Sequence, residues 1–198
     1  MGRLEALAKE RNHARTIETV NYSVDATHML SVGRLRDLRD FPSFGFTENP
    51  HPAGPMHDLE IFVLLRTPDL LIEDIEVAIH KVPRDDCLTL AHSLDAVVGI
   101  SVSRGFTDKV KSLAGGKRGC THLVHLLSTM APAILQGYWA MRDREEAPSP
   151  EAGRRRAESS ARYLKDSCYT WREDGEAFQE LLERAGGGTS GSAGDKTP

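Results

Sequence analysis

The sequence predicts a single-domain α+β fold, an antiparallel sheet of about four strands with three helices packed on one face. Two observations predict this class. In the first half of the 198 residues, apolar and polar side chains alternate around a tight turn, as in hairpin strands. In the second half, apolar residues recur every three or four positions, as on helices. With 39% hydrophobic residues the chain can form one sizeable core.

The first hairpin is expected directly after an N-terminal extension, residues 1–12. Residues 13–24, HARTIETVNYSV, are rich in β-branched side chains, which favour strands. Residues 26–40, ATHMLSVGRLRDLRD, continue the alternation. One face of this second strand would carry Met29, Ser31, Gly33 and Leu35. Residues 41–55 contain four prolines and two glycines, so we expect a long irregular loop there, and its role stays open.

A second hairpin gives the clearest structural signal. The stretches HDLEIFVLLR (57–66) and LLIEDIEVAIHKV (70–82) flank the turn TPD. Alternation places one apolar set in the core, namely Leu59, Ile61, Val63, Leu65, Ile75, Val77 and Ile79. His57 lies on the same face as the apolar residues of the first strand of this hairpin. The opposite face would carry the acidic residues Asp58, Glu60, Asp74 and Glu76.

Helical spacing replaces alternation after residue 83. We expect two short helices, within 87–100 and 105–114, the latter ended by Gly115, and a long helix over 121–142. The long helix would bury the stripe Leu123, Leu126, Leu127, Met130, Ile134, Tyr138 and Met141.

The domain organisation follows from composition. The core is expected over residues 13–143. Residues 144–160 are charged and interrupted by proline and glycine, which favours a linker. Residues 161–185 regain aromatic and leucine content and are expected to pack back on the core. Residues 186–198 are rich in glycine and serine, which is typical of a disordered tail.

Charge and hydropathy narrow the class of partner. Lys and Arg number 25 against 29 Asp and Glu, giving a net charge of −4, so we expect no nucleic-acid partner. No apolar run approaches the roughly 20 residues of a membrane span, and the start resembles no secretion signal. A cytoplasmic protein with a small-molecule partner is therefore expected, and a homo-oligomer stays open. The three cysteines are expected as reduced thiols.

The stretch AGGKRGCTHLVHLL, residues 114–127, is the first candidate site. A helix N-terminus stabilises negative charge, so a Cys120 thiolate or a bound carboxylate or phosphate would be favoured there. Cys120 and His122 are the candidate catalytic residues, and Lys117 and Arg118 the candidate substrate-binding residues. The alternative is a helix start capped by Thr121 with a buried thiol.

Residues at the start of the second hairpin form the next candidate. His57 shares the face of the apolar residues and directly follows the proline-rich loop, so His57 and Asp58 could line a pocket beneath that loop, and both are candidate catalytic residues as well. The acidic face of this hairpin could supply a general acid and base, because crowded carboxylates raise one another's pKa. The alternative is an ordinary solvent-facing sheet surface.

A metal site is a further alternative. Cys87, Cys120, Cys168 and His122 could converge as three thiolates and one imidazole, the ligand types that zinc and iron accept. No CxxC spacing is present, so the spacing itself does not indicate such a site.

Several sequence blocks resemble one known family. The strand opening HDL, the block GCTHL and the block DSCYTW carry the likeness, which spans about residues 13–175. The chain resembles the bacterial domain-of-unknown-function family 2889. The resemblance implies a shared fold and a shared site position and names no reaction. It adds weight to the residues in those blocks and in the further family block IEDIEVAIHKVPRDDC, residues 72–87, namely His57, Asp58, Cys87, Cys120, His122 and Cys168.

These observations predict a small cytoplasmic enzyme that uses acid/base chemistry, of lyase, isomerase or hydrolase type. Its substrate would be an anionic organic metabolite, aromatic or acyl. AGGKRG is neither a dinucleotide fingerprint nor a P-loop, so no nucleotide is indicated. The alternatives are a non-catalytic protein that binds a small molecule or a structural metal, zinc or iron, through the Cys/His set, and an accessory subunit of a partner enzyme.

Overall fold

A computed structural model describes residues 2–44 and 50–186. The chain divides into two compact units, Met1–Met141 and Arg142–Pro198. Apart from Gly186, the expected disordered tail lies outside the described residues. Residues 45–49, in the middle of the expected loop 41–55, also lie outside the described residues. Ser43 and His51, on either side of them, form an isolated β-bridge.

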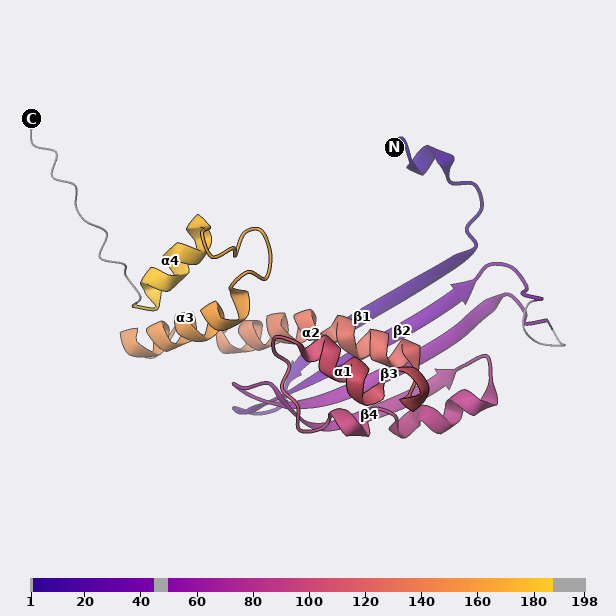
Figure 1. Cartoon of the computed structure of the whole chain (residues 1–198), viewed down its shortest axis with the longest axis horizontal. Coiled ribbons are helices and arrows are strands. Elements are labelled where there is room, and N and C mark those ends of the chain that lie inside the picture. The colour runs from indigo at the N-terminus through magenta and orange to yellow at the C-terminus, as the bar shows by residue number, and fades with distance from the viewer. Residues whose placement is uncertain (1, 45–49, 187–198) are drawn as a thin grey trace, which may run out of the picture. The chain divides into compact units, whose positions relative to one another are not determined.

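The first unit contains a four-stranded antiparallel sheet in the order β1-β2-β3-β4. The strands are β1 (His13–Ser23), β2 (His28–Arg39), β3 (Gly54–Arg66) and β4 (Leu71–Lys81). The helices α1 (Phe106–Ala114) and α2 (Thr121–Arg142) lie over one face of this sheet (Figure 1). The α+β prediction is therefore confirmed. The N-terminal extension forms only a short exposed 3-10 turn, η1 (Glu5–Leu7).

Alternation along the central strands builds the core beneath α2. The residues of β2 and β3 with the expected parity are almost completely buried, among them Met29, Leu35, Leu59, Ile61, Val63 and Leu65. The second hairpin has the expected register, with Ile61 opposite Val77 and Val63 opposite Ile75. Val77 is only partly buried, because β4 is an edge strand.

Helix α2 has the expected bounds and packs closely on β1 and β2. The expected stripe is buried at Leu123, Leu126, Leu127, Met130, Ile134 and Tyr138. A Cβ atom at Gly33 would collide with the side chain of Met130, so the missing side chain lets α2 approach β2. On β1, Asn21 Nδ2 donates a hydrogen bond to the carbonyl of Ala133, 3.0 Å away.

Two expectations about secondary structure were wrong. Residues 87–100 form no α-helix but the 3-10 segments η2 (Asp85–His92) and η3 (Asp95–Val97). Segment η2 buries no residue, so tertiary packing does not stabilise a regular helix there. The expected linker 144–160 contains most of α3 (Pro150–Leu164), because the Ser149 hydroxyl caps that helix by accepting from the Ala152 N–H.

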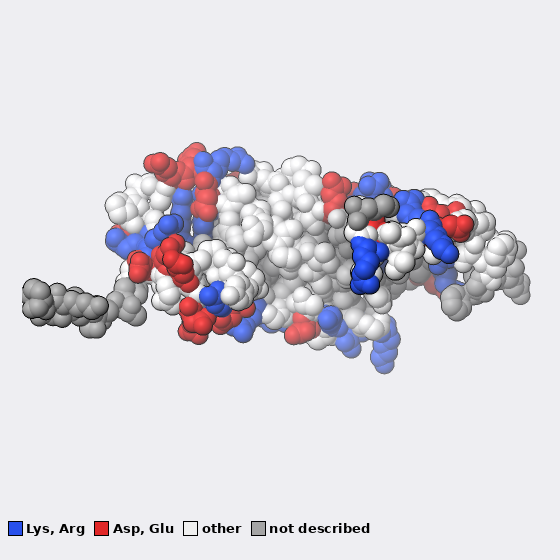
Figure 2. Space-filling model, turned by 90° about the horizontal axis from the view of Figure 1, so that it is seen from above, with Lys and Arg blue, Asp and Glu red and all other residues white. Residues whose placement is uncertain are grey.

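The second unit is built around α3 and α4 (Glu176–Arg184), which contact each other. Phe178 of α4 and Ala161 of α3 are its buried apolar residues. That the segment 161–185 packs on the sheet stays a prediction. Acidic and basic side chains are interspersed on the face seen in Figure 2, in line with the nearly balanced composition. No helix in the described ranges is long and apolar enough to span a membrane.

Candidate functional site

The helix-covered face of the sheet ends in polar residues instead of apolar ones. Asp37 continues the buried row of β2 that contains Leu35, and His57 continues the row of β3 that contains Leu59. The two residues are direct partners in the β2–β3 pairing, and the register shifts immediately after Asp37. Asp37 is only 3% exposed. A buried carboxylate of this kind needs several hydrogen-bond donors.

Four donor atoms surround the carboxylate of Asp37. Arg15 of β1 binds both oxygens, with Nε 2.7 Å from Oδ1 and Nη2 2.7 Å from Oδ2. His57 Nδ1 lies 2.9 Å from Oδ2, and His13 Nε2 lies 3.2 Å from Oδ1. Burial by itself would raise the pKa of Asp37, but the bonds from Arg15 and His57 outweigh it and lower that pKa to about 2. Asp37 is therefore ionised at neutral pH.

The first turn of α2 adds a histidine and a cysteine. The Cys120 carbonyl accepts the N–H of Val124 at 3.0 Å, so the cap position falls on Cys120 and not on Thr121 as expected. Cys120 Sγ lies 3.8 Å from His122 Nδ1. The other ring nitrogen, Nε2, lies 3.9 Å from Asp37 Oδ2. The His122 ring stacks on the His57 ring with centroids 3.8 Å apart.

Both stacked histidines favour the neutral state. Burial lowers the pKa of His57, although the hydrogen bond with Asp37 opposes that shift. Burial, and next the positive charges of His57 and Arg15, lower the pKa of His122 to about 4. The side chains keep 16% and 28% of their surface exposed, so small molecules can reach them.

The structure brings together some of the expected site residues. His57, Cys120 and His122 gather around Asp37, as described above. Lys117 and Arg118 form the short turn η4 (Gly116–Arg118) that leads into α2. Both are exposed, and neither side chain has a hydrogen bond or ion pair among the described residues.

Asp58 does not join this cluster, because it points to the opposite face of the sheet. Its carboxylate forms two 2.8 Å hydrogen bonds with Arg34 of β2. On the same open face Glu60 accepts from His80 Nε2 at 2.7 Å and lies 3.8 Å from Arg34. These two carboxylates are paired with cations instead of crowding one another, so the expected acidic acid/base face is not supported.

Of the expected set of three cysteines and His122, Cys87 lies in η2 and forms no ligand group with Cys120 and His122. Cys168 belongs to the second unit, so its place in this set stays a prediction. Within the described ranges, the one group of three or more ligand atoms from His, Cys, Asp or Glu that could share an ion is Asp37, His57 and His122. These atoms lie within 4.8 Å of one another.

Sequence reasoning missed the residues of β1 and β2 in the cluster. His13, Arg15 and Asp37 were not expected there. The alternation along β2 could have indicated Asp37, because Gly33, Leu35 and Asp37 are every second residue and therefore share one face of the strand. Arg39 was missed as well. Its positive charge acts on His57, and it has no ion-pair partner among the described residues.

A family model described as a protein of unknown function (DUF2889) matches residues 13–136, more than half of the chain. The chain belongs to the DUF2889 family. The DUF2889 match contains the residues of the cluster, Arg15, Asp37, His57, Cys120 and His122, and ends before Cys168. No curated protein and no solved structure matches the chain. The DUF2889 family therefore supplies no reaction, and functional argument depends on the cluster itself.

Proposed function

We propose that this DUF2889 protein is an enzyme that uses acid/base chemistry on an anionic organic metabolite. The observation that carries the proposal is the 2.9 Å contact between His57 Nδ1 and Asp37 Oδ2. An ionised carboxylate can only accept hydrogen bonds, so Nδ1 must carry the proton of the neutral ring. The lone pair of His57 is then on Nε2, where it can accept a proton from a substrate.

His122, whose ring lies against that of His57, affects how readily His57 gains and loses a proton. Two imidazolium ions with ring centroids 3.8 Å apart would repel, so protonation of one ring disfavours protonation of the other. The pair therefore holds at most one proton at a time and returns it readily, which suits a group that accepts a proton from a substrate and later gives it back. Cys120, 3.8 Å from His122 Nδ1, is placed to exchange a proton with that ring.

The surrounding charges favour an anionic substrate. Arg15 and Asp37 neutralise each other, whereas Arg39 has no acidic partner within the described ranges. Lys117 and Arg118 add two exposed positive charges just before the N-terminus of α2. A carboxylate or phosphate group would therefore bind beside the two histidines. Lyase, isomerase and hydrolase reactions all need proton transfers of the kind these histidines can perform.

The test follows proton transfer without knowledge of the net reaction. The protein is incubated in D₂O with aliphatic and aromatic carboxylates and acyl thioesters, and proton NMR records exchange, elimination and hydrolysis. We expect one substrate class to react, and His57→Gln to abolish the reaction. His80→Gln is the matched control, because His80 binds a carboxylate on the open face of the same sheet. Full activity in His57→Gln would contradict the proposal.

A second candidate function is the binding of a divalent metal ion, zinc or iron, by Asp37, His57 and His122. It is favoured by the convergence of these three ligand atoms within 4.8 Å. Two atoms that each bind one ion at about 2.1 Å are roughly 3.4 Å apart at the tetrahedral angle that zinc prefers and roughly 3 Å apart at the right angle of an octahedral iron site. The 2.9 Å between His57 Nδ1 and Asp37 Oδ2 is close to the second value. An ion would replace the proton between them, while Arg15 continued to orient the carboxylate.

Metal titration separates the two candidates. Chelator-treated protein is titrated with Co²⁺, whose visible absorption reports nitrogen and oxygen ligands, and with Zn²⁺ by calorimetry. Metal binding predicts one equivalent, lost in His122→Gln and kept in Cys87→Ser. If wild-type protein binds no ion but catalyses exchange, the metal candidate fails and the acid/base proposal stands.

A further inference from the structure

The two outer edges of the sheet differ in how their backbone is protected. At the edge formed by β4, the start of the strand is paired with the segment that follows η3. The Val102 N–H donates to the Leu70 carbonyl at 2.9 Å. The Gly99 N–H donates to the Ile72 carbonyl at 2.8 Å. Strand β4 also has two register shifts against β3. Covering segments and irregular pairing keep an edge strand from pairing with another chain.

The edge formed by β1 lacks these protections among the described residues. β1 pairs with β2 over 11 residues without a register shift, and its sequence, HARTIETVNYS, contains no proline, glycine or lysine. Three apolar side chains at its end are exposed, Val20 by 38%, Tyr22 by 52% and, just beyond the strand, Val24 by 54%. A long, regular and partly apolar edge of this kind is a template for another strand.

The outward-facing backbone groups of β1 can be identified from its bonds with β2. The Val24 N–H donates to the His28 carbonyl at 3.0 Å, and the Asn12 carbonyl accepts from the Asp40 N–H at 3.4 Å. Because backbone groups alternate in direction along an antiparallel strand, even-numbered residues bond to β2 and odd-numbered ones point outward. The outward residues have no backbone partner within the described ranges, and they are His13, Arg15, Ile17, Thr19, Asn21 and Ser23.

We propose that β1 pairs with β1 of a second copy of this chain, antiparallel and about a two-fold axis. Such pairing joins the two four-stranded sheets into one continuous sheet, and main-chain hydrogen bonds supply the affinity. The charges suit an antiparallel arrangement with a second copy. β1 begins with His13 and Arg15 and is followed by Asp25, so its basic start meets the acidic end of the partner's strand.

The register is centred on Thr19, the midpoint of residues 13–25. In this register every outward residue opposes an outward residue of the partner subunit, and the two strands exchange about ten hydrogen bonds. A centre at Glu18 would oppose two carboxylates, which is destabilising. A centre at Ile17 would leave the exposed Val24 opposite a residue that precedes the partner's strand. The centre at Thr19 avoids both faults.

Val20 is the position that tests this register. It lies opposite Glu18 of the partner subunit, and the two-fold axis repeats the contact. Its side chain points to the open face of the sheet, away from the Asp37 cluster on the helix-covered face. Because Val20 is 38% exposed in a single copy, its substitution should change the stability of that copy little.

The test is sedimentation velocity of the full chain over a wide range of concentrations, and we expect a concentration-dependent dimer. Val20→Glu opposes two pairs of carboxylates and should weaken the dimer by about tenfold or more. Val20→Lys opposes Glu18 instead and should dimerise within about threefold of wild type. Thr19→Pro removes an N–H that β2 does not use, at the centre of the interface, and should abolish dimerisation.

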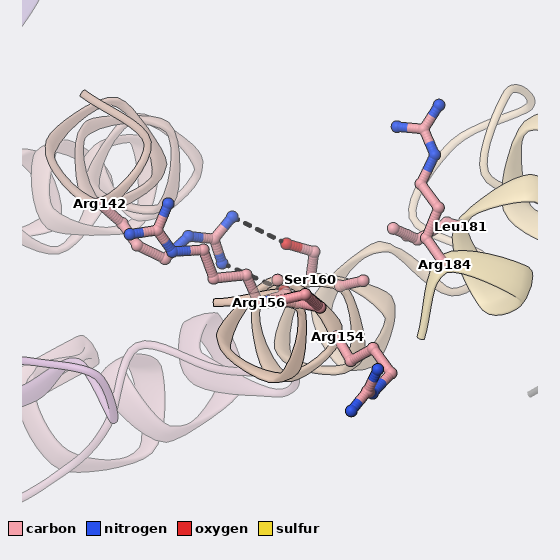
Figure 3. A pocket seen from close by; sticks show the side chains of 9 residues that line it. Arg142, Arg154, Arg156, Ser160, Leu181 and Arg184 are labelled. Carbon is pink, nitrogen blue, oxygen red and sulfur yellow. Dashed lines mark hydrogen bonds between the residues drawn. The ribbon is translucent and has the colours of Figure 1, made fainter. Parts of the chain in front are cut away.

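Arg154→Gln is the matched control for net charge. It lowers the net charge by one, as Val20→Glu does, but in the second unit, where the exposed Arg154 lines an open hollow and points away from Arg142 and Arg184 (Figure 3). This variant should dimerise like wild type. Hydrogen exchange locates the interface, because the outward amides of β1 should exchange more slowly in the dimer than in dilute monomer.

Four outcomes would overturn the proposal. They are a monomer at every concentration, a dimer whose β1 amides exchange as fast as in the monomer, equal weakening by Val20→Glu and Val20→Lys, and equal weakening by Arg154→Gln. If Thr19→Pro does not fold, the two Val20 variants answer the same question. The interface goes beyond the acid/base proposal and can fail separately, because none of the substituted residues belongs to the Asp37 cluster.

Discussion

Two histidine–carboxylate pairs lie on opposite faces of the same sheet. His57 and Asp37 are 2.9 Å apart on the helix-covered face, and His80 and Glu60 are 2.7 Å apart on the open face. The residue types and distances are nearly the same, but the surroundings differ. The side chains of His57 and Asp37 are 16% and 4% exposed, against 44% and 20% for His80 and Glu60.

This difference shows that burial, more than residue type, makes the site. Water solvates both partners on the open face, so such a pair contributes little to stability. On the covered face, removal of water strengthens every interaction of the Asp37 carboxylate, and it lowers the pKa of both stacked histidines. The acidic residues that attracted attention in the sequence lie on the face where the solvent weakens their interactions.

Removal of the buried carboxylate should have the largest effect on stability. Asp37→Ala leaves Arg15 and two histidines without their common acceptor. We expect the free energy of unfolding to fall by about 3 kcal/mol or more. Glu60→Ala, the open-face counterpart, should cost less than about 1 kcal/mol. Urea unfolding followed by circular dichroism measures both, and equal losses would refute the distinction between the faces.

Overpacking on the covered face should have the next largest effect. Gly33→Val places side-chain atoms where Met130 of α2 already lies, and Met130 is completely buried. We expect a loss of about 1–3 kcal/mol in the free energy of unfolding. Arg36→Val adds the same side chain to the same strand at an exposed position and should change stability little. Comparable losses would mean that α2 does not approach β2 this closely.

Periodicity and turn chemistry were sufficient to predict much of the fold. The pairing of Ile61 with Val77 and the bounds of α2 followed from residue spacing, because both depend on local sequence and one buried face. The segment 87–100 did not, because η2 buries none of its side chains and packing therefore does not stabilise an α-helix there. Ser149 and Pro150 are a helix start signal inside a stretch that its charged composition suggested was a linker.

The candidate site was only half predictable. His57, Cys120 and His122 stand out because histidine and cysteine are chemically distinctive residues. Asp37 does not, since a single carboxylate in an arginine-rich strand is normally a surface residue. Its role depends on the register of three strands and on where α2 begins, and these are properties of the tertiary structure.

The pH dependence of stability should show a smaller effect, because His122 keeps 28% of its side chain exposed. Its pKa is about 4 in the folded protein against the ordinary 6.5, so the unfolded chain binds more protons between these values. The stability that His122 contributes is present above pH 6.5, is lost as the pH falls toward 4, and does not change further below that. The pKa of Asp37 is lowered from 3.8 to about 2, so Asp37 makes stability depend on pH only between these two lower values.

Urea midpoints of chelator-treated protein at pH 7 and pH 4.5 test this sign. Wild type should lose stability between the two values, and His122→Gln should lose less. His92→Gln replaces an exposed histidine of η2 and should behave like wild type. A wild-type protein that becomes more stable at pH 4.5 would show that its buried histidines prefer the charged state.

The smallest effect should come from the open-face pair itself. A double-mutant cycle with Glu60→Gln and His80→Gln isolates the coupling between the two side chains from their other contacts. Because the partners are 20% and 44% exposed, water and salt screen their charges, and we expect a coupling of about 0.5 kcal/mol or less that falls further at 1 M NaCl. The equivalent cycle with Asp37→Asn and His57→Gln should give a larger coupling that salt barely changes, because the carboxylate is buried. If the two couplings are equal and equally sensitive to salt, then α2 does not exclude water from the covered face, and the argument that burial turns His57 into a base fails with it.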